Sequence, residues 1–302
     1  MIDRLILVGD NPFHGVSHIS QERAFQRSGG ILGAKHAAEL VLTSVNSGAN
    51  GFTFTVSETS LSILREINQY ELSDRLPLYP LVPNVNEVVR NTTSFGGVSG
   101  LAQSMAKKMA TVINFELLAN LTGGVLRNRP ELILRAYLKW EYLKLQKALG
   151  GTKSAYLASI ILHEVVTDMA LALDMQWLFQ AHIDYMRKLK LKPGFETRNL
   201  PYLIKQFKKW HINIRGIVIE APFNPIGFQM CPSQADCEKA LNGTDGSEVI
   251  AFSVLAAGYV RLQEALGYAH SLPGLCGVAI GISNEKQAVE TFTMAKQILA
   301  DG

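Results

Sequence analysis

Short apolar segments alternate with amphipathic segments eight times along this chain of 302 residues. The expected strands are Leu5–Val8, Gly51–Thr55, Leu78–Val82, Tyr156–His163, Gly194–Thr197, Gly216–Ala221, Val249–Leu255 and Gly277–Ile282. The expected helices include Ala34–Asn46, one that follows Ser57, much of Asp168–Lys190, Leu200–Trp210, Tyr259–Ala269 and Glu285–Ala300. Eight strand–helix units predict an α/β fold, the (β/α)8 TIM barrel, in which chemistry takes place at the C-terminal ends of the strands.

One interval of the alternation is too long for a single barrel helix. About seventy residues separate the third and fourth strands, where one helix and its loops need about twenty. Pro130–Leu149 suits the third barrel helix, so we expect residues 84–129 to be a helical insertion, with a helix near Ser104–Leu121. A lid, a contact between copies in a homo-oligomer, or a structural elaboration all fit. No linker divides the chain, which predicts one domain over residues 1–302.

Composition narrows the class of protein. With 47% hydrophobic and 18% charged residues, the chain can bury parallel strands on both faces. The net charge of +3 does not favour nucleic acid, and the basic runs Arg187–Lys192 and Lys205–Lys209 suit solvated helix faces. No apolar stretch approaches the length of a membrane span, and Met1–Val8 does not read as a signal peptide. Three cysteines without metal-ligand spacing predict reduced thiols in a cytoplasmic protein.

Polar residues at the strand ends are the candidates for a site. A carboxyl inside the apolar strand Gly216–Ala221 is costly unless it is paired, protonated or functional, which points to Glu220. His163 closes the fourth strand, and Glu58 follows the second, where a helix first turn is the structural alternative. We therefore expect His163, Glu220 and Glu58 to be catalytic.

Further polar residues are expected to bind substrate or phosphate. The substrate-binding candidates are Asp10, Asn11, His14, Asn84 and Asn224, and the cofactor- or phosphate-binding candidates are Ser253, Ser283 and Asn284. Asp10 and Asn11 also suit a turn, and Ser283 and Asn284 also suit a helix cap. Asp10, His14, Glu58, His163 and Glu220 can ligate a divalent metal only if they converge. No lysine ends a predicted strand, which argues against Schiff-base chemistry.

From the fourth strand onward, the chain resembles the aldo-keto reductases, (β/α)8 barrels that reduce carbonyls with NADPH. The resemblance lies in Tyr156–His163, Glu220–Asn224, Ala251–Gly258 and Ile280–Gln287. It implies a site histidine at His163, a cofactor-facing strand end near Ser253 and a phosphate-holding turn at Ser283 and Asn284.

The first half of the chain departs from that family. Thr53 and Glu58 stand where the family has an aspartate and a tyrosine, and Leu81–Asn84 lacks its lysine. Glu220 replaces a neutral amide, which places negative charge where the nicotinamide would bind.

Three functions therefore remain open. The first is acid/base or metal-assisted chemistry, as in an isomerase, lyase or hydrolase, on a small polar substrate. The second is an NAD(P)-dependent oxidoreductase with Glu58 or His163 as an altered proton donor. The third is a ligand-binding barrel without catalysis.

Overall fold

The computed structural model describes residues 4–14, 33–72, 74–85, 87–88, 109, 114–151 and 154–300. Its strands are β1 (Leu5–Gly9), β2 (Gly51–Thr55), β3 (Leu76–Val82), β4 (Ala155–Leu157), β5 (Ser159–Leu162), β6 (Lys192–Glu196), β7 (Val218–Pro222), β8 (Glu248–Phe252) and β9 (Gly277–Gly281). Its helices are α2 (Ala34–Asn46), α3 (Glu58–Ile67), α6 (Phe115–Leu126), α7 (Pro130–Leu149), α8 (Glu164–Ala172), α9 (Gln176–Lys188), α10 (Leu200–Lys209), α11 (Gln234–Ala240), α12 (Leu262–Ser271) and α13 (Glu285–Ala300). Short 3-10 turns are η1 (Asn11–His14), η2 (Leu241–Gly243) and η3 (Ala256–Gly258).

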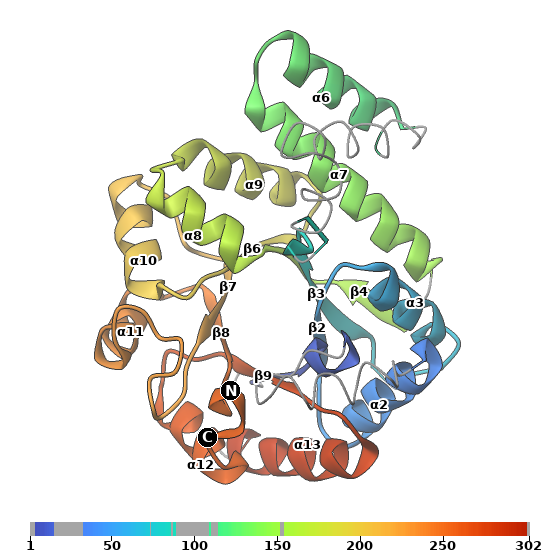
Figure 1. The fold of residues 1–302 in the computed structure, drawn as a ribbon, viewed down its shortest axis with the longest axis vertical. Coiled ribbons are helices and arrows are strands. Elements are labelled where there is room, and N and C mark those ends of the chain that lie inside the picture. Colours follow the sequence, from blue (N-terminus) through green and yellow to red (C-terminus); the bar gives the residue numbers. More distant parts are fainter. Residues whose placement is uncertain are drawn as a thin grey trace.

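The strands form one closed parallel sheet. Their order is β2-β1-β9-β8-β7-β6-β5-β3-β4, and β2 also pairs with β3. Both β4 and β5 pair with β3 and are separated only by Ala158, so together they make up the single strand predicted at Tyr156–His163. The result is an eight-stranded parallel barrel with helices around its outside, as Figure 1 shows. The predicted (β/α)8 fold is confirmed.

Alternate side chains of each strand face opposite sides of the barrel wall. Six inward-facing side chains fill the barrel as one buried cluster: Leu7, Tyr79, Leu81, Ile161, Val218 and Ile250. The outward-facing residues belong to a larger cluster that packs against the helices. Because both faces are buried, the strands read as nearly continuous apolar runs.

Small residues make room for the inward-facing side chains. A Cβ atom on Gly194 would lie 2.5 Å from Cγ1 of Ile161 and 2.6 Å from Oγ of Ser159. Any larger residue at this position would collide with the adjacent strand, so the barrel closes here only around a glycine.

Local signals set several helix ends where they were predicted. Ser57 caps α3 by accepting a hydrogen bond from the Ser60 backbone N–H, while the Ser60 hydroxyl accepts from the Ser57 backbone in return. Helix α7 starts with Pro130 and stops at Gly150, which adopts φ +55°.

Three predicted elements were wrong in their bounds. The single helix expected over Asp168–Lys190 is divided into α8 and α9, because Asp174 between them has a left-handed φ of +53°. The strand expected at Val249–Leu255 ends at Phe252, where Ser253 turns the chain with φ +52°. The following turn η3 delays α12 to Leu262, although a helix over Tyr259–Ala269 was expected.

Helix α6 lies within the predicted insertion of residues 84–129. It packs against α7 on the outside of the barrel, farther from the strands than any neighbouring helix in Figure 1. The predicted helix Ser104–Leu121 overlaps α6 only from Phe115 onward. Most of the remaining insertion lies outside the described residues.

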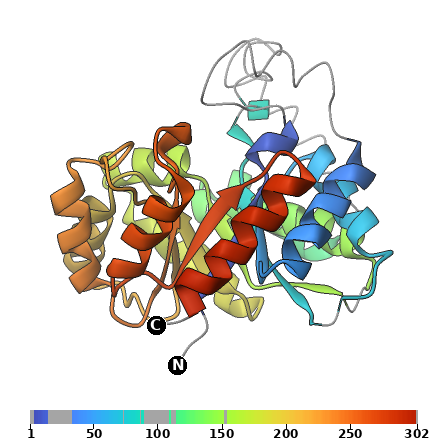
Figure 2. The same ribbon diagram turned by 90° about the horizontal axis from the view of Figure 1, so that it is seen from below.

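The C-terminal ends of all strands meet at one end of the barrel. Figure 2 shows η1, which directly follows β1, at the upper end of the barrel. Since every strand pair is parallel, the polar residues that follow the strands share this end. In the described part of the chain, no helix is both long and apolar enough to cross a membrane.

Candidate active site

Glu220 projects from β7 into the barrel and is 2% exposed. Burial raises its pKa from 4.5 to about 8, against the opposing effect of Thr53, and the negative charge of Asp10 raises it further. Its Oε1 lies 3.0 Å from the Thr53 hydroxyl oxygen, which is 3.1 Å from the carbonyl oxygen of Tyr79. Thr53 has one hydrogen to give. A protonated Glu220 can donate to Thr53, which then donates to Tyr79, so all three groups are satisfied by a neutral acid.

Glu196 provides a second buried carboxyl beside the first. It lies on β6 directly opposite Glu220 in the strand register. Its Oε2 accepts a hydrogen bond of 2.9 Å from the Glu164 backbone N–H. Burial, together with the negative charges of Glu164 and Glu220, raises the pKa of Glu196 well above its usual value. Two adjacent strands therefore carry buried carboxyl groups whose pKa values are both raised, that of Glu220 to about 8.

His163 lies next to this carboxyl pair, at the solvent-accessible end of the barrel. Its side chain is 20% exposed, and its Nδ1 lies 3.8 Å from Oε2 of Glu196. Nδ1 also accepts a hydrogen bond of 3.2 Å from the Val165 backbone N–H, which makes His163 the N-cap of α8. Burial lowers the pKa of His163, so the ring is neutral at pH 7. Since Nδ1 is an acceptor, the ring hydrogen is on Nε2.

An ion pair borders His163. The guanidinium of Arg198 binds the Glu164 carboxylate with both Nε and Nη2, the first bond being 2.7 Å. The Arg198 backbone N–H donates to Asp168 at 3.1 Å, and the Thr197 hydroxyl donates to the other oxygen of Asp168. These bonds attach the loop after β6 to α8 and hold a positive charge near the histidine.

Asp10 is the third predicted residue brought to this cluster. Its Oδ2 accepts a hydrogen bond of 2.8 Å from the Thr55 backbone N–H, and the Phe13 N–H donates to its carbonyl oxygen. Its charge raises the pKa values of both Glu220 and His163. Asn11 is exposed, and the side chain of His14 lies outside the described residues. Their roles in substrate binding stay predictions.

Three other candidates lie apart from the cluster or have their polar groups engaged elsewhere. Glu58 is exposed in the first turn of α3 and forms no hydrogen bond or ion pair with described residues. Asn84 accepts a hydrogen bond of 3.2 Å from the Glu87 N–H. The Asn224 amide donates to the Phe228 carbonyl at 2.8 Å and accepts from its N–H at 2.8 Å, which holds the loop after β7.

The predicted phosphate-binding residues form local caps. Asn284 accepts a hydrogen bond of 2.9 Å from the Gln287 N–H, and the Gln287 side chain accepts one of 2.9 Å from the Ser283 N–H. The Ser253 hydroxyl donates to the Gln229 amide at 2.9 Å. A role for these three residues in cofactor binding stays a prediction.

The candidates from the sequence do not include Glu164, Glu196 or Arg198. The signal was present, because charged residues follow the short fifth strand directly. Only the register between β6 and β7 shows that Glu196 and Glu220 are neighbours. Among the described residues, no group of three or more His, Cys, Asp or Glu side chains could hold a metal ion.

No protein-family model matches the sequence, and no curated protein matches it either. Solved structures are similar in three dimensions. A Pseudomonas aeruginosa protein described as an aldo-keto reductase has a TM-score of 0.59 at 12% identity, over 97% of this chain and 90% of that chain. A Bacillus halodurans aldo-keto reductase has a TM-score of 0.52 at 11% identity, over 98% and 91%. A protein described as a 2,5-diketo-D-gluconic acid reductase B has a TM-score of 0.55 at 11% identity, over 100% and 90%.

The similarity of these structures establishes the fold of the chain, but the sequence identities are too low to establish its activity. The chain folds as a (β/α)8 barrel that is similar in three dimensions to solved structures described as aldo-keto reductases.

Proposed function

We propose that this barrel is an NAD(P)-dependent oxidoreductase that reduces a small polar carbonyl compound, with His163 as the altered proton donor. Three solved structures of the same fold are described as reductases, and all cover at least 97% of this chain. The histidine stands at the end of the barrel where such folds place their chemistry.

The observation that carries the proposal is the fixed orientation of His163. Val165 engages Nδ1, so the hydrogen on Nε2 is free to donate to a substrate oxygen, and no described residue accepts it. A neutral imidazole can polarise a carbonyl through its Nε2–H as negative charge develops on the oxygen. When the proton is transferred to the oxygen, the imidazolate that is left takes up a proton from water, since the His163 side chain is 20% exposed. The positive charge of Arg198 favours that developing charge and also lowers the pKa of the ring.

The residues present are compatible with a nicotinamide cofactor. The raised pKa of Glu220 keeps its carboxyl neutral at pH 7, which removes the negative charge expected from the sequence. At the start of α13, the backbone N–H groups of Glu285 and Lys286 have no acceptor among the described residues and suit a phosphate. Ser253, Ser283 and Asn284 lie on the loops that would hold the cofactor. When bound, the cofactor supplies the hydride.

The test is titration with NADPH and NADH, followed by protein fluorescence, together with carbonyl-dependent oxidation of the cofactor. We expect quenching and turnover, with kcat/KM of His163→Gln lower by about 100-fold or more. His36→Gln is the matched control, because His36 is 51% exposed on α2 and should leave the rate unchanged. Absence of quenching by both cofactors, with no turnover of any carbonyl, would reject the proposal.

A second candidate function is favoured by the adjacent carboxyls Glu196 and Glu220. Carboxyl groups that are protonated at neutral pH can act as general acids, as in isomerases and lyases. Under this alternative, Glu196→Gln should abolish turnover of a substrate that requires no nicotinamide. Under the oxidoreductase proposal, the same variant should retain cofactor binding.

A further inference from the structure

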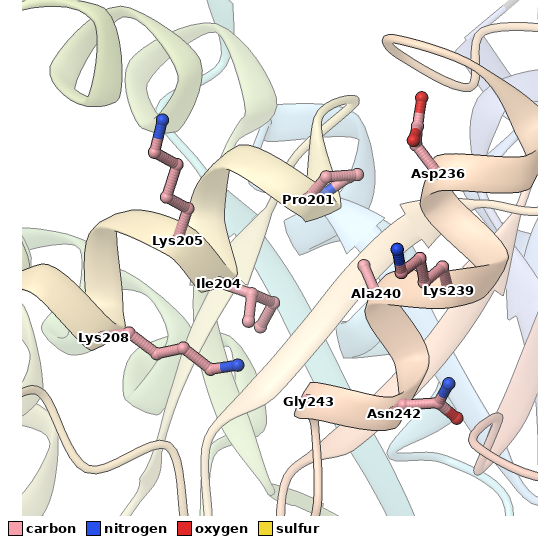
Figure 3. Close-up of a pocket in the computed structure, with 9 residues that line it drawn as sticks. All are labelled: Pro201, Ile204, Lys205, Lys208, Asp236, Lys239, Ala240, Asn242 and Gly243. Carbon is pink, nitrogen blue, oxygen red and sulfur yellow. The ribbon is translucent and has the colours of Figure 1, made fainter.

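A groove lies on the outer wall of the barrel between α10 and the α11–η2 segment, away from the strand ends. Its volume is about 530 Å³, within the range of small-molecule sites. Its lining residues are Pro201, Ile204, Lys205, Lys208, Asp236, Lys239, Ala240, Asn242 and Gly243. Figure 3 shows these side chains arranged on two facing helical segments.

Two lysines converge across the groove. In Figure 3, Lys208 extends from α10 toward α11, and Lys239 extends from α11 toward α10, whereas Lys205 points away from α11. The Lys208 ammonium nitrogen reaches the opposite wall, where it lies 3.4 Å from the position that a Cβ atom on Gly243 would take.

The ammonium groups of Lys208 and Lys239 lack a carboxylate partner among the described residues. Neither lysine forms an ion pair or hydrogen bond in the part of the chain that the structure describes. The adjacent Lys209, by contrast, is paired with Asp174 at 2.8 Å. Asp236 on the groove rim accepts a hydrogen bond of 2.6 Å from the Ser233 hydroxyl at the start of α11. An anion bound in the groove would be attracted by both ammonium groups.

Apolar side chains also line the groove. Ile204 and Pro201 contribute from α10, and Ala240 contributes from α11. A ligand that fits both features has an anionic head and a compact apolar body. A phosphomonoester carries nearly two negative charges at neutral pH, which matches two lysines, whereas a carboxylate carries one.

We propose that this groove binds an organic phosphomonoester, with its phosphate between Lys208 and Lys239 and its apolar part against Pro201, Ile204 and Ala240. The Asn242 amide, which also lines the groove, can donate to the phosphate. This site is separate from the strand ends, so it does not depend on the proposed oxidoreductase activity.

Isothermal titration calorimetry, in which the full chain is titrated with phenyl phosphate at low ionic strength, tests the proposal by measuring the binding affinity. We expect one saturable site whose affinity decreases with added salt. Lys208→Gln and Lys239→Gln should each weaken binding by about fivefold to tenfold. Lys209→Gln removes the same charge from the same helix outside the groove and should change the affinity by less than about twofold. Circular dichroism should show equal folding in all variants, because these side chains are exposed.

Two further probes separate the parts of the ligand. Benzoate has the same ring with a single charge, and inorganic phosphate has the charge without the ring. Both should bind at least about fivefold more weakly than phenyl phosphate. Equal binding of benzoate would overturn the assignment to a phosphate, and equal binding of inorganic phosphate would overturn the apolar contact. Wild-type affinity in both lysine variants, or no saturable binding of phenyl phosphate, would overturn the site.

Discussion

Replacement of Glu220 by glutamine should stabilise this protein increasingly as the pH rises. The folded state holds the Glu220 proton to a pKa of about 8, whereas 4.5 is the usual value expected in the unfolded chain. Between these two values, the unfolded chain loses the proton first, so wild-type stability falls as pH increases. Glutamine is uncharged at every pH in this range, and its amide can still donate a hydrogen bond to the Thr53 hydroxyl.

The size of the effect follows from the two pKa values. One pKa unit corresponds to about 1.4 kcal/mol, so the folded wild type loses about 5 kcal/mol between pH 4 and pH 9 through this group alone. At 2% exposure, water screens little of this energy. The variant should therefore be nearly as stable as wild type at pH 4 and more stable by about 5 kcal/mol at pH 9.

Urea unfolding followed by circular dichroism, at intervals from pH 4 to pH 9, measures this difference. Glu248→Gln is the matched control on the neighbouring strand, because the 29% exposed Glu248 pairs with Lys192 at the opposite end of the barrel. The free energy of unfolding of this control variant should be lower than that of wild type by at most about 1 kcal/mol, and it should not exceed the wild-type value at high pH. A difference between Glu220→Gln and wild type that stays constant with pH would refute a neutral buried Glu220.

Four further substitutions test the packing and the buried groups. Burial lowers the pKa of His182 from 6.5 to about 3, so the unfolded chain takes up a proton at a higher pH than the folded chain does. The free energy of unfolding should therefore fall by up to about 5 kcal/mol as the pH drops from 6.5 to 3. His182→Gln should reduce this fall, measured as the midpoint of urea unfolding at each pH. Gly194→Ala should cost about 1–3 kcal/mol through its clash with Ile161, whereas Gly267→Ala, with open space on α12, should gain about 1 kcal/mol, both measured by thermal unfolding. Ser57→Ala should cost about 1 kcal/mol by removing the α3 cap, and an unchanged Tm would count against that cap.

Much of the fold could be predicted from the sequence because its signals are local. Helices Ala34–Asn46, Pro130–Leu149 and Glu285–Ala300 have the predicted bounds, since periodicity, prolines and glycines act within a few residues. Signals of this kind miss single left-handed residues such as Asp174 and Ser253. These residues divided one predicted helix and shortened one predicted strand.

The candidate site was predictable only in part. The sequence placed Asp10, His163 and Glu220 at strand ends, and barrel closure brings Asp10 within electrostatic range of both His163 and Glu220. It did not show that Glu196 lies opposite Glu220, because register depends on how neighbouring strands pair. For Glu58, the sequence left open a catalytic role and a place in a helix first turn, and the structure has it exposed in the first turn of α3.

The sequence by itself determined the order of eight strands and their helices, and therefore the end of the barrel where polar residues gather. The tertiary structure decided which of those residues meet, and whether each is charged. Burial and neighbouring charges set the pKa values of Glu196, Glu220 and His163, and both come from segments distant in the chain. Likewise, Lys208 and Lys239 line one groove only because α10 packs against α11.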